Sequence, residues 1–177
     1  MSRPYRDRAP PKPLERAALE QLALSYVGRY ATTRAKLGRY LERKLRERGW
    51  DGEGGAPVNA IVERCATLGY VDDGAFAASR GAALGRRGFG ERRIADALRD
   101  AGIAPEDAAP VREAAREDPL AAALIFARRR RIGPFAAEDG DADRRRKALG
   151  ALLRAGHPMD VSRRVAFAAV GAELDRE

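Results

Sequence analysis

The spacing of hydrophobic residues along the chain predicts a protein built from helices. After a proline-rich start, apolar side chains recur three or four residues apart at Leu19, Leu22, Tyr26, Val27 and Tyr30. The pattern continues, with polar residues between, to about residue 169. One face of a helix repeats every 3.6 residues, so this spacing favours amphipathic helices over strands. We therefore expect an all-α protein.

Residues 72–102 predict a helix, a tight turn and a second helix. Asp72 or Asp73 is expected to cap the first helix with its carboxylate. The basic turn Arg86–Gly90 places two glycines around one aromatic ring. This arrangement suits a sharp reversal, because glycine reaches positive φ without steric cost. The second helix is expected to end at Gly102.

Six further helices follow from the same spacing. Leu37, Leu41 and Leu45 recur every four residues, and Gly49 ends their helix. The other five are expected at residues 58–68, 105–116, 120–131, 143–156 and from 158 onward. Between residues 132 and 142 we expect a loop that is mobile at its acidic centre.

Several residues stand where helix ends are expected. Thr32 or Thr33 precedes the second helix of the chain, and Asp118 precedes a proline at the first position of a later one. Each can cap through its side-chain oxygen. The bulky Trp50 and Tyr70 also fall at helix ends, where we expect them to pack on the core.

The glycines that end three of these helices reveal an internal repeat. Gly49, Gly102 and Gly156 lie 53 and 54 residues apart. Each has a leucine four residues before it, an apolar residue eight before and an arginine ten before. In chain order these are Leu45, Leu98 and Leu152; Leu41, Ile94 and Ala148; and Arg39, Arg92 and Arg146. The repeat predicts a tandem array of three three-helix modules. Their expected bounds are 14–71, 72–117 and 118–177, after a mobile basic tail at 1–13.

Charge follows the same period. Lysine and arginine number 34 against 26 aspartates and glutamates, which gives a net charge of +8 and a pI near 10.2. Residues 33–49, 80–99 and 128–147 carry net charges of +5, +4 and +4, whereas 50–75 and 100–118 each carry −4. A general excess of arginine would not alternate in this way, so we expect a polyanion as partner. The candidate DNA- or filament-binding residues are Lys36, Arg39, Arg43, Arg86, Arg87, Arg92, Arg93, Arg99, Arg128, Arg129, Arg130 and Arg146.

Catalytic and metal chemistry find little support in the sequence. His157 is the only histidine and Cys65 the only cysteine, so no disulfide can form within the chain. Catalytic histidines act with an oriented partner, and His157 has none nearby in sequence, so we interpret it as structural. We expect no enzyme activity, cofactor or metal. No apolar run approaches the length of a membrane span, and the N-terminus has no secretory core, so we expect a cytoplasmic protein.

Residues 69–102 resemble the central module of the RecX family, regulators of the RecA recombinase. In that family a Gly-aromatic-Leu-Asp-Asp element leads to Phe-Ala, then to an arginine-rich turn with Gly-x-Gly, then to Arg-Ile and a Leu-x-x-x-Gly ending. The matching positions are Gly69–Asp73, Phe76–Ala77, Arg86–Gly90, Arg93–Ile94 and Leu98 to Gly102. Tyr26, Tyr30 and residues 37–49 also resemble the family's first module. Two departures are the glycine-rich loop 51–57 and His157–Pro158, which stands where an aromatic and a small residue are expected.

The resemblance covers about residues 15–170 and implies an elongated, curved array of three-helix modules. It also implies a non-enzymatic modulator that binds within the groove of the RecA–DNA filament and reduces its ATPase and strand exchange. The implied partners are the RecA filament and single- and double-stranded DNA without sequence specificity, bound by a monomer.

An alternative interpretation is a helix-turn-helix DNA-binding protein of the transcription-regulator type. Arg86–Gly90 and the helix after it would then be a turn and a recognition helix. Against this, Gln21 and Asn59 are the only side-chain amides in the chain, and neither lies on a basic helix. A weaker alternative is a protein–protein adaptor that does not bind DNA.

Overall fold

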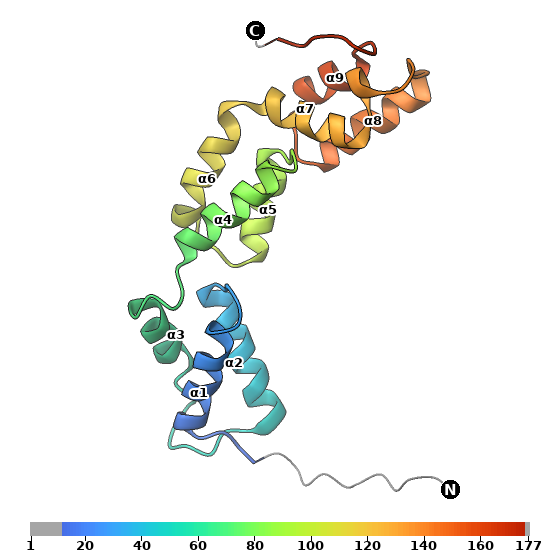
Figure 1. Cartoon of the computed structure of the whole chain (residues 1–177). Helices are drawn as coiled ribbons and strands as arrows, with labels where there is room; N and C mark the ends of the chain where they lie inside the picture. The colour runs from blue at the N-terminus through green and yellow to red at the C-terminus, as the bar shows by residue number, and fades with distance from the viewer. Residues whose placement is uncertain (1–11, 176–177) are drawn as a thin grey trace, which may run out of the picture. The chain divides into compact units, whose positions relative to one another are not determined.

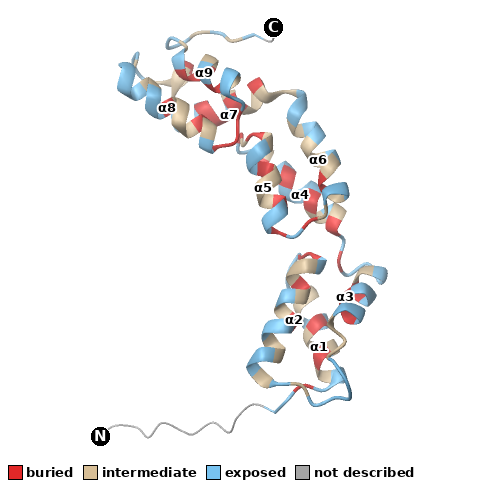
Figure 2. Cartoon of the chain, turned by 180° about the vertical axis from the view of Figure 1, so that it is seen from behind, coloured by how far each residue is buried: buried red, intermediate tan, exposed pale blue. Residues whose placement is uncertain are grey.

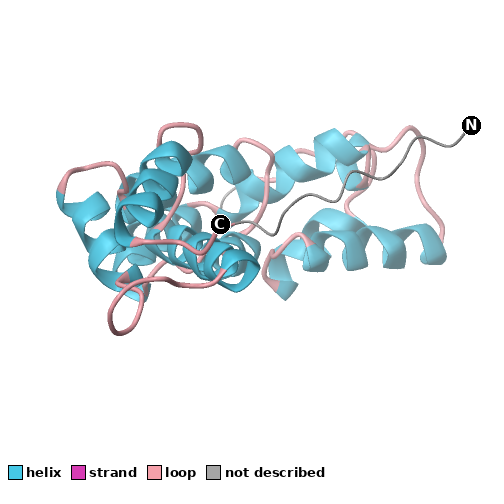
Figure 3. Ribbon diagram, turned by 90° about the horizontal axis from the view of Figure 1, so that it is seen from below, coloured by secondary structure: helices cyan, strands magenta, loops and turns pink. Residues whose placement is uncertain are grey.

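The computed structural model describes residues 12–175, which contain α-helices, one 3-10 helix and no β-strand, so the all-α prediction is confirmed (Figures 1 and 3). The chain separates into two compact units, one ending at Asp72 and the other beginning at Asp73. Of the predicted basic tail, residues 1–11 lie outside the described range.

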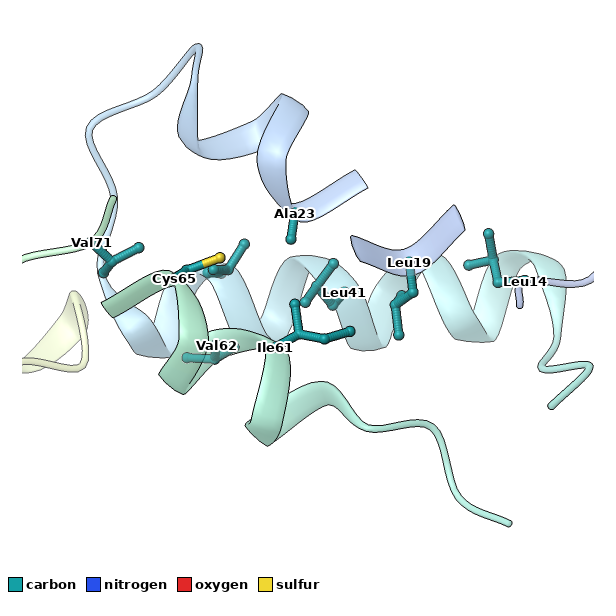
Figure 4. Close-up of a cluster of buried hydrophobic side chains, with 9 residues drawn as sticks. Leu14, Leu19, Ala23, Leu41, Ile61, Val62, Cys65 and Val71 are labelled. Carbon is teal, nitrogen blue, oxygen red and sulfur yellow. The ribbon is translucent and has the colours of Figure 1, made fainter. Parts of the chain in front are cut away.

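The first unit contains α1 (Arg16–Val27), α2 (Arg34–Arg48) and α3 (Val58–Thr67). Leu19, Leu41 and Ile61, one from each helix, point into a common core (Figure 4). Leu14 is fully buried at its edge, and its backbone bonds to Gly49 and Asp51. The unit therefore has its own apolar core, closed at one end by the segment before α1.

The second unit contains six helices and two apolar clusters (Figure 2). The helices are α4 (Asp73–Gly85), α5 (Glu91–Asp100), α6 (Pro105–Glu117), α7 (Pro119–Arg130), α8 (Ala142–Arg154) and α9 (Met159–Phe167), with the 3-10 turn η1 (Gly133–Phe135) between α7 and α8. One cluster joins α4, α5 and α6, and the other joins α7, α8 and α9. Phe89 packs against both clusters. The division into three modules stays a prediction, since the later six helices form one compact unit.

Helix ends follow the local signals in the sequence. Thr33 and Asp118 accept hydrogen bonds from the backbone N–H groups of Lys36 and Ala121, at 3.1 and 2.9 Å. The three aligned glycines, at 49, 102 and 156, all have positive φ, between 75° and 92°. These glycines therefore end their helices in the conformation that their alignment predicted.

Two predictions about aromatic residues fare differently. Trp50 is partly buried against the core of the first unit, and its indole N–H donates to the Gly54 carbonyl at 3.1 Å. Tyr70 is 53% exposed, so its predicted core packing is wrong. The adjacent Val71 is buried instead, because the chain after α3 turns Val71 inward and its neighbour outward.

Candidate nucleic-acid interface

The basic residues predicted on α2 lie within the first unit. Arg39 and Arg43 are exposed and Lys36 is half-buried. The Arg43 guanidinium lies over the Tyr40 ring, 5.5 Å from its centroid, and its Nε lies 3.6 Å from a Glu47 carboxylate oxygen. This helix thus presents positive charge next to an aromatic side chain.

The second basic group surrounds the turn between α4 and α5. Arg86 and Arg87 lie in the turn and Arg92 and Arg93 in the first turn of α5, all exposed. Arg99, near the end of α5, forms a salt bridge with Asp96 at 2.9 Å. Four of the predicted cationic residues therefore lie at the N-terminal end of α5: Arg86, Arg87, Arg92 and Arg93.

The turn between α4 and α5 is fixed by the chain segment between α8 and α9. The Gly90 N–H donates to the Ala155 carbonyl at 2.9 Å, and the Arg92 guanidinium donates to the Leu153 carbonyl. His157 Nε2 lies 3.0 Å from the Gly88 carbonyl oxygen. One bond between backbone groups and two from side chains to backbone carbonyls therefore hold the turn in position against the second cluster.

The turn also packs closely against α7. A Cβ atom on Gly88, whose φ is +75°, would lie 2.3 Å from the backbone nitrogen of Phe126. Real Cβ atoms do not approach backbone so closely, so only glycine fits here. This close approach explains the glycine before the aromatic residue of the predicted turn.

Two phenylalanines connect the arginines of this turn to those that end α7. The Phe89 and Phe126 ring centroids lie 6.0 Å apart. Arg87 lies over Phe89 at 5.0 Å, and Arg130 lies over Phe126 at 5.6 Å. Such cation–π contacts hold a guanidinium in place without neutralising its charge. The structure thus gathers Arg87 and Arg130, 43 positions apart in sequence, around one aromatic pair.

The remaining candidates lie apart from this pair of rings. Arg128 stacks on Phe135 at 4.7 Å, while Arg129 is exposed beside it at the end of α7. Arg146, exposed on α8, donates to the carbonyl of Ala142 in its own helix at 3.4 Å. The predicted residues at the α4–α5 turn and at the end of α7 are therefore linked through Arg87 and Arg130, and the others of this group adjoin these two in sequence. Arg99 and Arg146 lie outside the group, and the α2 residues lie in the other unit.

His157 has a structural position. It is 2% exposed, its ring packs 5.9 Å from that of Phe126, and burial lowers its pKa. Since a carbonyl oxygen can only accept, the Nε2 atom must carry the proton that bonds to Gly88. Its Nδ1 is then unprotonated, and it has no hydrogen-bond partner within the described residues. The interpretation of His157 as structural is confirmed.

Two further observations concern the cysteine and the potential metal ligands of the described residues. Cys65 is buried in the core of the first unit, and burial raises the pKa of its thiol, which keeps it protonated. Within residues 12–175, no three His, Cys, Asp or Glu side chains are grouped to hold a metal ion. In the same range no helix combines the length and apolarity needed to cross a membrane.

The sequence prediction missed one cluster of the first unit. The turn after α1 and the exposed side of α2 bring together three tyrosines and three cations, of which only Arg43 was a candidate. The others are Tyr26, Arg29, Tyr30, Tyr40 and Lys44. Tyr26 and Tyr30 had been assigned to the apolar face of the first helix. The signal was present as Arg29 and Tyr30 just beyond the end of α1, but the sequence does not reveal which ring is exposed.

Comparisons with known proteins give consistent results. No protein-family model matches the chain. The regulatory protein RecX of Myxococcus xanthus (strain DK1622) is 34% identical over 173 residues, which cover 90% of this chain and 91% of the relative. The regulatory protein RecX of Agrobacterium fabrum (strain C58) is 31% identical over 137 residues, 75% of this chain and 73% of the relative.

Solved structures agree on the fold. The crystal structure of RecX from Lactobacillus salivarius has a TM-score of 0.60 at 19% identity and covers 84% of this chain and 92% of its own. A second crystal structure, of regulatory protein RecX, has a TM-score of 0.59 at 21% identity, over 82% of this chain and 68% of its own.

Proposed function

The chain belongs to the RecX family of regulatory proteins, and from that premise we propose that it binds the RecA–DNA filament and inhibits the ATPase and strand exchange of the recombinase. The observation that carries the proposal is the group of arginines at the α4–α5 turn and the end of α7. These residues are exposed and come from separate segments of the chain, which the contacts of Arg87 with Phe89 and of Arg130 with Phe126 bring together.

The proposed role of these arginines is to contact DNA phosphates along the filament. Arg86, Arg93 and Arg129 form no salt bridge with any residue between 12 and 175, so their charges are available to a polyanion. Contacts of this kind position a protein on DNA and carry no sequence information. The proposal therefore includes single- and double-stranded DNA bound without sequence preference, together with the α2 residues Lys36, Arg39 and Arg43.

The remaining features of the proposal concern how the protein acts. We take the three-helix groups 14–71, 72–117 and 118–177 to be successive modules that extend along adjacent recombinase protomers. The protein would act as a monomer, without a cofactor and without catalysing a reaction. A partner on chromosomal DNA would place this activity in the cytoplasm.

A helix-turn-helix transcription regulator fits the geometry less well. A recognition helix reads bases with its N-terminal residues, which must enter the major groove. Here the start of α5 packs on the second cluster: a Cβ on Gly156 would lie 2.3 Å from the backbone nitrogen of Arg93. The end of α5 that should face DNA bases is thus partly covered by the α8–α9 connection.

The experiment that tests the proposal is the single-stranded-DNA-dependent ATPase of the cognate recombinase, titrated with this protein. We expect inhibition at a few molecules per many recombinase protomers, because blocking or capping a filament affects all of its subunits. The double variant Arg86→Gln with Arg93→Gln should inhibit less, and Arg163→Gln, an exposed arginine of α9 outside the candidate set, should inhibit normally. Unchanged ATPase at stoichiometric amounts would refute the proposal.

A further inference from the structure

The first unit contains a cleft that joins aromatic rings to positive charge. Its volume is about 450 Å³, and it opens between the turn after α1 and the exposed side of α2. Its principal lining residues are Tyr26, Arg29, Tyr30, Tyr40, Arg43 and Lys44.

The three tyrosines form a graded stack from core to solvent. Tyr26 and Tyr40 are stacked with ring centroids 4.2 Å apart and planes 18° apart, and both pack against the apolar core. Tyr30 lies 5.3 Å from Tyr26 at an angle of 50° and is 58% exposed. The inner rings are thus held by the core, and the outer ring offers its surface to solvent.

The turn that carries Tyr30 is fixed by its backbone. The N–H groups of Arg29 and Tyr30 both donate to the Tyr26 carbonyl, each at 3.1 Å. Because the backbone of the turn is already ordered, less conformational entropy is lost when a flat ligand stacks on the Tyr30 ring. A tyrosine left exposed on a fixed turn is a feature of binding surfaces more than of cores.

The charges of the cleft are positive in sum. Arg43 and Lys44 share the carboxylate of Glu47, at 3.6 and 2.6 Å. Arg29 is exposed and forms no salt bridge with any residue of the described range. Three cations against one carboxylate leave an excess that suits a phosphate next to the rings.

We propose that this cleft binds one unpaired nucleotide of single-stranded DNA, with its base stacked on Tyr30 and its phosphate held by Arg29. Aromatic platforms beside positive charge are the usual means of binding single strands, since every base has a face that can stack. Bases in a duplex already stack on one another, so the cleft favours unpaired DNA. The inference deepens the proposed function and rests on its DNA-binding part.

The test compares DNA affinities of the full-length protein by fluorescence anisotropy at fixed salt. The probes are a labelled 20-mer of deoxythymidine, a 20-mer of the same charge whose central positions are abasic, and a 20-base-pair duplex. The variants are Tyr30→Ala, Tyr30→Phe, which keeps the ring, and Tyr70→Ala, which removes an exposed tyrosine of the same unit outside the cleft. Circular dichroism confirms that each variant is folded.

We expect Tyr30→Ala to weaken binding of the base-bearing single strand about tenfold, in line with the usual value of one stacked base. Affinity for the abasic strand and the duplex should change less than twofold, and Tyr30→Phe and Tyr70→Ala should bind all probes normally. Equal losses on base-bearing and abasic strands, or no loss, would overturn the inference. Normal DNA binding by Tyr30→Ala combined with weaker inhibition of the recombinase would also overturn it, and would indicate a protein contact instead.

These outcomes are separate from the test of the proposed function. If the unaltered protein inhibits the recombinase but Tyr30→Ala shows no loss specific to unpaired bases, only the cleft inference fails. If Tyr30→Ala shows that specific loss while the unaltered protein leaves the ATPase unchanged, the cleft stands and the filament-regulator proposal fails.

Discussion

His157, in the connection between α8 and α9, bonds through Nε2 to the carbonyl oxygen of Gly88 at 3.0 Å, across 69 positions of sequence. Gly88 lies in the turn between α4 and α5 that carries Arg86 and Arg87. The bond ties the basic turn to the second apolar cluster, where the His157 ring packs against Phe126. The position of the basic turn therefore depends in part on the packing of one buried imidazole.

The stability of the second unit should fall as the pH drops below about 6.5. Burial lowers the pKa of folded His157 below its ordinary value of 6.5, so the unfolded chain binds a proton first. Stability is thus fully present above pH 6.5 and is lost as the pH falls from there toward the lowered pKa. Protonation would place a new N–H at Nδ1, which has no acceptor within the described residues. Thermal unfolding midpoints at pH 5.5, 6.5 and 7.5 measure the effect.

The matched variant for this prediction is His157→Gln, whose side-chain amide can still donate to the Gly88 carbonyl. It should be less stable at pH 7.5 but should lose its pH dependence between 5.5 and 7.5, because His157 is the only histidine in the chain. The ionisable residues that line the cleft beside His157 are Glu91, Arg92 and Arg116. The Glu91 carboxylate forms a salt bridge with Arg116 at 3.0 Å. An unchanged pH profile in His157→Gln would assign the effect to other groups.

Gly88 should tolerate alanine far less well than a glycine of the same backbone conformation. Gly171 lies in the same unit with a φ of 74° and has nothing within 4 Å of an added Cβ, so Gly171→Ala should cost only the strain of a left-handed residue, about 1 kcal/mol. Gly88→Ala adds contact with the backbone of Phe126 and should lower the free energy of unfolding by about 3 kcal/mol. Urea unfolding followed by helical circular dichroism gives both values, and equal losses would contradict the close approach.

Local signals in the sequence predicted most of the fold. Helix caps and the glycines that follow helices depend on contacts within a few residues, so the neighbouring sequence was sufficient to predict them. These positions are Thr33, Asp118, Gly49, Gly102 and Gly156. Apolar spacing likewise identified the helix faces that form the cores. The burial of Tyr70 was predicted wrongly, because the burial of a side chain at a helix end depends on the direction of the chain after the helix. The local sequence does not specify this direction.

Less of the candidate site than of the fold could be predicted from the sequence. Charge periodicity identified the basic segments, but not that Phe89 and Phe126 would bring Arg87 and Arg130 together. That contact spans more than thirty positions and depends on the packing of two clusters. The tyrosine cleft was missed for a similar reason, since Tyr40 stacks on Tyr26 only when α1 and α2 are packed.

Thr32 and Thr33 are adjacent and buried, yet they should respond in opposite ways to valine. The Thr33 hydroxyl oxygen caps α2, so Thr33→Val should lower the stability of the first unit by about 1 kcal/mol. The Thr32 hydroxyl is buried without a hydrogen-bond partner among the described residues, so Thr32→Val should be neutral or stabilising. Trp50, the only tryptophan, packs on this core, so its fluorescence during urea unfolding reports this unit. A larger loss in Thr32→Val than in Thr33→Val would contradict the assigned cap.

Neutralising two exposed arginines that form no salt bridge among the described residues should weaken DNA binding through their charge. Arg87 and Arg92 also contact Phe89 and the Leu153 carbonyl, so changing them would disturb packing, whereas Arg86 and Arg93 form no salt bridge within the described residues. If each neutralises one phosphate, Arg86→Gln with Arg93→Gln should reduce the slope of log affinity against log salt by about 1.4 on single-stranded DNA.

Fluorescence anisotropy of a labelled oligonucleotide between 50 and 200 mM salt measures that slope. Over this range of salt, a protein that makes many phosphate contacts loses about 10³-fold or more in affinity. The control Arg163→Gln removes one charge from α9, half the change of the double variant, and should leave the slope within error of the unaltered protein. If Arg163→Gln loses about half as much slope as the double variant, net charge governs binding and the turn is not the interface. If only the double variant loses slope, Arg86 in the α4–α5 turn and Arg93 in the first turn of α5 contact DNA, next to the turn that His157 joins to the second cluster through Gly88.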